Sequence, residues 1–327
     1  MAPAAGARKM IDILPQSARL LRPRFAPKSR LTMPRPDDLP HRFPAPNQPD
    51  PQWLERMYNN RLRVPEHGEH FARWAAQSAL VRGAVPCALD VPYGEGARER
   101  LDAFAAPKRG APLVVFVHGG YWKALDKSQH SFVAGALNDM GAAAVLPNYT
   151  LCPQASIPQI TLQVAQAVAW AWRNAKDLNA DARRLTVVGH SAGGHLAAMM
   201  LACAWDVMDA GLPPHIVRAA MGVSGLYDLA PLMDTPRLHE VLRLTPQQVH
   251  EASPVRLPAP RQGRLLAVVG GEESGEYLRL NSAIQQAWGR QRVPQAVAVA
   301  GLNHFSIVDA LATPGHRLNR MLKEWVF

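Results

Sequence analysis

The chain has 327 residues, of which 48% are hydrophobic and 19% are charged. This balance is typical of a globular protein and excludes disorder over most of the length. No apolar run approaches the roughly 18 residues that a membrane-spanning helix needs, so we expect no membrane partner. The three cysteines are widely spaced and match neither a disulfide framework nor a zinc-ligand pattern. They indicate a reducing compartment, and we expect a cytoplasmic protein.

The formal net charge of +10 is concentrated in an N-terminal leader. Residues 1–32 contain seven basic residues and one acidic residue. The remaining chain is too weakly basic to indicate a phosphate-binding surface, so we expect no nucleic-acid partner. Closely spaced prolines disfavour helix and strand, and residues 1–50 are therefore predicted to be a disordered, solvated extension, upstream of an alternative start at Met33. An organelle-targeting segment and a nucleic-acid-binding arm are the other interpretations.

A single domain is predicted from residue 51 to residue 327. It begins with helical segments at 53–60 and 67–78 and a short alternating strand at 87–93. Apolar strands then alternate with longer helical segments: strands at 112–118, 142–149, 185–189, 216–225, 265–271 and 296–301, and helices at 128–140, 157–178 and 194–205. This alternation predicts an α/β fold with a mostly parallel, doubly wound sheet. The proline-rich residues 229–262 are predicted to form a short cap.

The pattern G-x-S-x-G occurs at Gly189-His190-Ser191-Ala192-Gly193, between a predicted strand and a predicted apolar helix. A strand-to-helix turn this sharp needs small neighbours, because it strains the serine backbone and projects the hydroxyl above the sheet. The alternative interpretation of this motif is an ordinary glycine-rich turn between a strand and a helix, without a catalytic role. The strand-to-helix context favours Ser191 as a nucleophile.

Paired glycines follow the buried strand 112–118, at Gly119 and Gly120. They leave their backbone N–H groups uncovered, so that these can face a developing oxyanion. The second donor of such a site is the N–H of the residue after the nucleophile, here Ala192. The sequence therefore predicts an oxyanion hole.

A serine nucleophile needs a base, and the base needs a third group that holds its tautomer. In an open α/β sheet of this kind the chain order is serine, acid, histidine. His304 follows the strand predicted at 296–301 and is the one late histidine at a strand end, whereas His316 is expected on the surface of the last helix. His304 is the predicted base.

The acid is expected directly after the strand at 265–271, where Glu272 and Glu273 both stand. Asp228, after an earlier strand, is a third candidate. The residues alone leave the choice open.

Four aromatic side chains stand at or near the ends of predicted strands. They are predicted to line a substrate pocket, with packing in the core as the alternative for each: Tyr121, Trp122, Tyr149 and Tyr227.

From about residue 50 to residue 327, the chain resembles the serine-hydrolase type of kynurenine formamidase, within the α/β-hydrolase superfamily. The likeness rests on short segments spread along the chain: MYNNR (57–61), HGGYW (118–122), LPNYTLCP (146–153), GHSAGGHL (189–196), SGLYDLAPL (224–232) and NHF (303–305). HGGYW together with GHSAGGHL is fairly specific for this group. The resemblance implies an α/β-hydrolase fold with Ser191 as nucleophile, His304 as base and N–H donors at Gly119 and Gly120.

The family usually has an aspartate in a D-S-x-E-F-like turn, where this chain has Glu273-Ser274-Gly275-Glu276-Tyr277. Glu273 is thus the acid by position, longer than aspartate by one methylene. The implied reaction is hydrolysis of an N-formyl aryl amide, N-formylkynurenine, to kynurenine and formate through a formyl-serine. A carboxylesterase that uses the same residues on small acyl esters is the alternative.

The resemblance implies no cofactor and no metal, because the histidine-rich motif of the metal-dependent formamidases is absent. The expected partner is a small-molecule substrate. A monomer and a homodimer both remain open.

Overall fold

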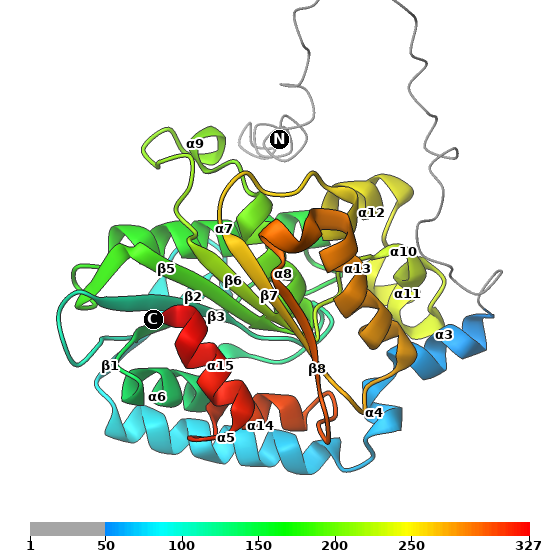
Figure 1. Cartoon of the computed structure of the whole chain (residues 1–327), viewed down its shortest axis with the longest axis horizontal. Helices are drawn as coiled ribbons and strands as arrows, with labels where there is room; N and C mark the ends of the chain where they lie inside the picture. Colours follow the sequence, from blue (N-terminus) through cyan, green and yellow to red (C-terminus); the bar gives the residue numbers. More distant parts are fainter. Residues whose placement is uncertain (1–49) are drawn as a thin grey trace, which may run out of the picture.

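A computed structural model describes residues 50–327, so the predicted leader lies almost wholly outside the described residues. The centre of the described domain is one sheet with the following strands: β1 (Cys87–Pro92), β2 (Arg100–Phe104), β3 (Ala111–Val117), β4 (Ala143–Pro147), β5 (Ala180–His190), β6 (Ala219–Val223), β7 (Arg264–Gly270) and β8 (Gln295–Val299). Their order in the sheet is β1-β2-β4-β3-β5-β6-β7-β8 (Figure 1). The strands from β4 to β8 pair in parallel, and β2 is antiparallel to both of its neighbours. The predicted mostly parallel sheet is confirmed.

The helices lie before the first strand, in the connections between strands and after the last strand. They are α3 (Pro51–Tyr58), α4 (Asn60–Arg63), α5 (His67–Ala84), α6 (Ser131–Asp139), α7 (Ile157–Arg173), α8 (Ala192–Ala202), α9 (Trp205–Met208), α10 (Ala230–Met233), α11 (Pro236–Leu242), α12 (Pro246–Ala252), α13 (Gly275–Arg292), α14 (Ser306–Ala312) and α15 (Arg317–Val326), with 3-10 turns η2 (Lys127–Gln129) and η3 (Pro254–Arg256). Within residues 50–327, none of them is long and apolar enough to cross a membrane.

The core lies in two layers, one on each face of the sheet. Alternate residues of a strand point to opposite faces. In β3, Leu113 and Val115 join the core beneath α7, α8 and α13, whereas Val114 and Phe116 join the core beneath α5, α6, α14 and α15. Figure 1 shows α5, α6, α14 and α15 together below the sheet. Burial on both faces explains why the central strands are continuous apolar runs, and the doubly wound fold is confirmed.

Strand β2 was not predicted, because a charged residue interrupts its apolar pattern. Asp102 is 1% exposed, and its Oδ1 accepts a hydrogen bond of 2.6 Å from Lys127 Nζ. The same ammonium group donates to Asp90 Oδ1 at 2.7 Å. Burial lowers the pKa of Lys127, but the two carboxylates outweigh this effect and raise the pKa above its ordinary value. A buried charge in a strand is tolerated when it is paired in this way.

The proline-rich residues 229–262 contain three short helices, α10, α11 and α12. Proline stands in the first turn of each, at Pro231, Pro236 and Pro246. A proline costs little there, because the N–H that it lacks has no acceptor within the helix. The prolines therefore begin helices in this segment, and α11 packs against α3 (Figure 1).

Candidate functional site

Five neighbouring strands of the sheet, β3, β5, β6, β7 and β8, run parallel. The segments that follow their carboxyl ends bring together Gly119, Ser191, Ser224, Glu273 and His304. Ligands of open α/β sheets bind in the crevice at this edge. The fold thus collects at one edge the groups that the sequence predicts for catalysis.

Ser191 lies in the turn from β5 to α8 with a backbone conformation of φ 56° and ψ −117°. Strain of this kind costs about 1–3 kcal/mol and is characteristic of functional sites. The neighbouring glycines are required by contact: a Cβ on Gly189 would lie 2.0 Å from the Gly193 carbonyl oxygen, and a Cβ on Gly193 would lie 1.9 Å from the Val117 oxygen. The Ser191 N–H donates to the Val223 oxygen at 2.8 Å, which ties the turn to β6.

His304 is paired with Glu273. Its Nδ1 lies 2.6 Å from Glu273 Oε2, and the side chain of Glu273 is fully buried. Since a carboxylate only accepts, the proton of this bond lies on Nδ1, which leaves Nε2 free to accept a proton. Glu272 is exposed, and Asp228 pairs instead with Arg256 at 3.2 Å. Of the three acids considered, Glu273 is the one that contacts His304.

The other oxygen of Glu273 is held by two donors. Oε1 accepts from Ser224 Oγ at 2.6 Å and from the backbone N–H of Gly270 at 2.8 Å. Three donors in total therefore fix one buried carboxylate, as a charge in a low-dielectric site requires. The sequence analysis missed Ser224, although it directly follows β6 in the segment SGLYDLAPL.

His190 supports the backbone of His304. Its Nε2 lies 2.9 Å from the His304 carbonyl oxygen, to which it donates. Burial, reinforced by repulsion from His304, lowers the pKa of His190 well below its ordinary value, so the ring is neutral near pH 7. Inside the serine motif, His190 is thus a positioning residue that the sequence analysis did not identify.

The glycine loop after β3 contacts Ser191. A Cβ built on Gly119 would lie 3.0 Å from Ser191 Cβ. Within residues 50–327, the N–H groups of Gly119 and Gly120 have no protein acceptor. The N–H of Ala192, the first residue of α8, has no acceptor in its own helix. All three groups are therefore available to an oxygen atom near Ser191.

Two buried rings hold this loop in place. His118 Nδ1 donates to the Gly119 oxygen at 2.8 Å, and Tyr149 OH donates to the His118 oxygen at 3.0 Å. The two rings stack with centroids 4.5 Å apart. Burial lowers the pKa of His118 to about 4, so this side chain is neutral near pH 7 and acts as a hydrogen-bond donor through one nitrogen.

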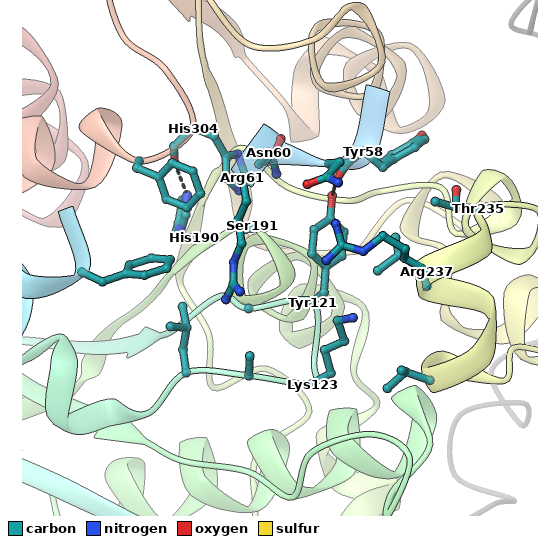
Figure 2. A pocket seen from close by; sticks show the side chains of 18 of the residues that line it. Tyr58, Asn60, Arg61, Tyr121, Lys123, His190, Ser191, Thr235, Arg237 and His304 are labelled. Carbon is teal, nitrogen blue, oxygen red and sulfur yellow. Dashed lines mark hydrogen bonds between the residues drawn. The ribbon is translucent and has the colours of Figure 1, made fainter. Parts of the chain in front are cut away.

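A cavity of about 370 Å³ opens over Ser191 and His304 (Figure 2). Its wall combines aromatic, aliphatic and basic side chains with the proposed catalytic groups: Glu55, Tyr58, Asn59, Asn60, Arg61, Phe71, Trp74, Gly120, Tyr121, Lys123, Ala124, Leu125, His190, Ser191, Thr235, Arg237, Leu238, Val241, His304 and Phe305. Nine of these twenty residues belong to α3, α4, α5 and α11, segments to which the sequence analysis gave no role in the pocket.

Of the four predicted pocket aromatics, Tyr121 alone lines the cavity. The prediction was wrong for Trp122, Tyr149 and Tyr227, each of which is 0% exposed and packs in the core. The Trp122 ring meets His195 edge-on at 5.0 Å. The Tyr227 hydroxyl donates to the Gly222 oxygen at 3.3 Å. At a strand end a side chain can turn beneath the sheet edge as easily as away from it.

A cluster of hydroxyl groups adjoins Ser191. Tyr121 OH donates to the Tyr58 oxygen at 2.6 Å and lies 2.7 Å from Tyr277 OH, which also accepts from Asn60 Nδ2 at 2.9 Å. The Tyr277 hydroxyl lies close to the side chain of Ser191, and the centroids of the Tyr277 and His304 rings are 4.7 Å apart. Because the Tyr121 proton is committed to a carbonyl, the single proton of Tyr277 is donated to the Tyr121 hydroxyl.

Within the part of the chain that the structure describes, no group of three or more histidine, cysteine, aspartate or glutamate side chains could hold a metal ion. His195 is one of the buried histidines. Its Nε2 donates to the Ala252 oxygen at 2.6 Å, and burial lowers its pKa to about 4. This side chain therefore supports packing.

Comparisons with known proteins agree with this architecture. The family model BD-FAE matches residues 101–238. Kynurenine formamidase of Danio rerio is 28% identical over 265 residues, which cover 79% of this chain and 88% of the relative. Esterase LipQ of Mycobacterium tuberculosis is 31% identical over 193 residues, 55% of this chain and 42% of the relative. A crystal structure of a protein from a Silicibacter species, provisionally described as a thioesterase, is 32% identical with a TM-score of 0.72 and covers 84% of this chain and 98% of that one.

Proposed function

The chain is a hydrolase of the α/β-hydrolase superfamily and belongs to the group that contains the kynurenine formamidases and related esterases. From this premise we propose that it cleaves N-formyl aryl amides such as N-formylkynurenine. One observation carries the proposal. A histidine paired with a fully buried carboxylate stands beside a strained serine at the floor of an aromatic cavity. These are the elements of an activated serine nucleophile.

In the first step Ser191 Oγ attacks the formyl carbon, and His304 Nε2 takes the hydroxyl proton. Glu273 accepts from Nδ1 throughout and stabilises the imidazolium that forms. The carbonyl oxygen becomes an oxyanion that accepts from the N–H of Ala192 and from the N–H of Gly119 or Gly120. Among residues 50–327, no backbone or side-chain acceptor competes for these donors, which supports the assignment.

In the second step the tetrahedral adduct collapses. The C–N bond breaks, and His304 returns its proton to the departing arylamine. Water then attacks the formyl-serine while His304 takes one of its protons. Formate leaves as the C–O bond to Ser191 breaks, and the proton returns to Oγ.

The walls of the cavity support an aryl substrate. Phe71 and Phe305 meet edge to face with centroids 5.4 Å apart, beside Trp74. Aromatic pairs of this kind offer about 0.5–1.5 kcal/mol beyond the burial of their area. A cavity of about 370 Å³ holds one aromatic ring and a short chain.

An esterase is the second candidate, because esterase LipQ is 31% identical over 193 residues and the same groups serve ester and amide cleavage. The two activities differ in the leaving group, since an amine must be protonated to depart.

The test is turnover of N-formylkynurenine, followed by the absorbance of kynurenine, beside turnover of p-nitrophenyl acetate. We expect efficient formamide cleavage that Ser191→Ala abolishes. Ser253→Ala, a buried serine away from the cavity, is the matched control. Ester cleavage without formamide cleavage would still agree with a serine hydrolase but would reject N-formyl aryl amides as its substrates.

A further inference from the structure

Three basic side chains surround the cavity: Arg61 from α4, Lys123 from the loop after β3, and Arg237 from α11. Figure 2 labels all three among the side chains that line the cavity, with Arg61 drawn next to Ser191 and with Lys123 and Arg237 to the right. The three elements are far apart in the sequence, so helix periodicity does not explain why the side chains meet. The mechanism described above uses none of them.

Their positive charge is only partly neutralised. Arg237 Nη1 lies 3.4 Å from Glu55 Oε1, and this is the one ion pair that any of the three makes within residues 50–327. The carboxylate of Glu240 also attracts the Lys123 ammonium group, without forming an ion pair with it. Three cations thus share one paired carboxylate at the cavity wall.

Lys123 shows the effect of this imbalance. Burial lowers its pKa, and repulsion from Arg237 and Arg61 lowers it further, against smaller opposing effects of Glu55 and Glu240. A bound anion would relieve this repulsion. Arg61 also lies over the Phe71 ring at 5.6 Å, so the basic group directly adjoins the aromatic wall.

We propose that Arg61, Lys123 and Arg237 form an anion subsite that binds a carboxylate carried by the aryl substrate. The small cavity, with aromatic side chains in its wall beside the basic ones, favours a compact ligand in which the carboxylate and the ring are separated by a short chain. The inference rests on the proposed function for the identity of the reacting bond, and it names the class of substrate: aryl formamides or esters with a carboxylate side chain. Arginine and lysine both pair with carboxylates, and arginine does so with two parallel hydrogen bonds.

A binding experiment tests the subsite independently of catalysis. The probes are 4-oxo-4-phenylbutanoate and the alcohol of the same skeleton, neither of which has a bond that a hydrolase can cleave. Calorimetry on the wild-type chain should give at least about tenfold tighter binding of the carboxylate. Lys123→Gln, and separately the double variant Arg61→Gln/Arg237→Gln, should each reduce that preference at least about threefold. Raising the salt concentration should weaken it in the wild type.

The control is Arg63→Gln, because Arg63 lies on the same helix as Arg61 but does not line the cavity. It should keep the wild-type preference. Arg61 and Arg237 are exposed, so the double variant should fold even where Lys123→Gln does not. Equal binding of the two probes to the wild type, or a preference that both basic-group variants retain, would overturn the subsite.

Kinetics separate this inference from the proposed function. The ratio of kcat/KM for N-formylkynurenine to kcat/KM for formanilide, which has no carboxylate, should fall in the same variants. A wild-type chain that cleaves neither compound yet prefers the carboxylate probe would reject the proposed function and support the subsite. A chain that cleaves both with a ratio insensitive to the substitutions would reject the subsite alone.

Discussion

Replacing Glu273 by glutamine tests the least expected feature of the site, a glutamate where the related family usually has aspartate. The carboxylate accepts three hydrogen bonds: from His304 Nδ1 at 2.6 Å, Ser224 Oγ at 2.6 Å and Gly270 N at 2.8 Å. A glutamine amide has one oxygen and one NH₂ group, so it cannot accept on both sides.

The glutamine amide will adopt the orientation that keeps the larger number of hydrogen bonds, with its oxygen toward two donors and its NH₂ group toward one ring nitrogen. With its oxygen toward Ser224 and Gly270, its NH₂ group faces His304 and forces the proton from Nδ1 to Nε2. The ring then has no free nitrogen toward Ser191. An imidazole held in the wrong tautomer loses about 10⁴-fold in kcat in a well-studied serine protease, equivalent to about 5 kcal/mol. We expect Glu273→Gln to lower kcat by about 10³- to 10⁴-fold with little change in KM.

The assay is steady-state turnover of p-nitrophenyl acetate and N-formylkynurenine across pH 6 to 9, with circular dichroism to check folding. Glu272→Gln is the matched control, because its carboxylate is adjacent in sequence and exposed. It should retain wild-type activity. If folded Glu273→Gln retained more than about a tenth of wild-type kcat, the tautomer argument would be wrong, and a large loss in Asp228→Asn would then identify the acid.

Three further predictions concern the surroundings of the site. Tyr277→Phe removes the hydroxyl next to Ser191 and should lower kcat/KM about 3- to 30-fold without loss of fold, measured on both substrates; an unchanged value would show that this hydroxyl does not position Ser191. Gly193→Ala would place a methyl group 1.9 Å from the Val117 oxygen, so it should destabilise the chain by more than about 3 kcal/mol in urea unfolding, and a wild-type midpoint would contradict the contact. Burial lowers the pKa values of His118 and His195 to about 4, so unfolding exposes groups that bind protons more readily. Stability should therefore be full above about pH 6.5 and fall as the pH drops toward 4; a midpoint that stays constant or rises there would show that these histidines are not buried and neutral.

The sheet could be predicted largely because its central strands are buried on both faces. β3, β7 and the buried second half of β5 are then mostly apolar runs that the sequence displays directly. Strand β2 was not predicted because it contains the charged residue Asp102, whose burial depends on pairing with Lys127 outside the strand. A pairing between distant segments leaves no mark in the local pattern.

The residues proposed for catalysis were accessible to sequence reasoning to different degrees. Ser191 follows β5 directly and His304 lies in the loop after β8, and parallel strands place such residues at one edge. The choice between Glu272 and Glu273 depends on which way each side chain points after β7, which residue type alone does not determine. Position relative to the family motif selected Glu273, and the contact with His304 agrees with that selection.

The pocket wall was largely unpredictable. Aromatic residues at strand ends were assumed to face the substrate, yet Tyr149 turns inward to support the glycine loop. The wall is built instead from segments such as α4 and α11. The MYNNR segment (57–61), which overlaps α4, supported the family likeness but did not indicate a pocket. Only tertiary packing brings Arg61 and Arg237 to the same cavity as Ser191.

The central claim is that Ser191 is an activated nucleophile. Intact-mass measurement after treatment with a fluorophosphonate, followed by peptide mapping, tests it most directly. We expect one adduct per wild-type chain, on the peptide that contains Ser191, none on Ser191→Ala, and strongly slowed labelling of Glu273→Gln. Equal labelling of Ser191→Ala, or no labelling of a folded wild-type chain, would contradict the account.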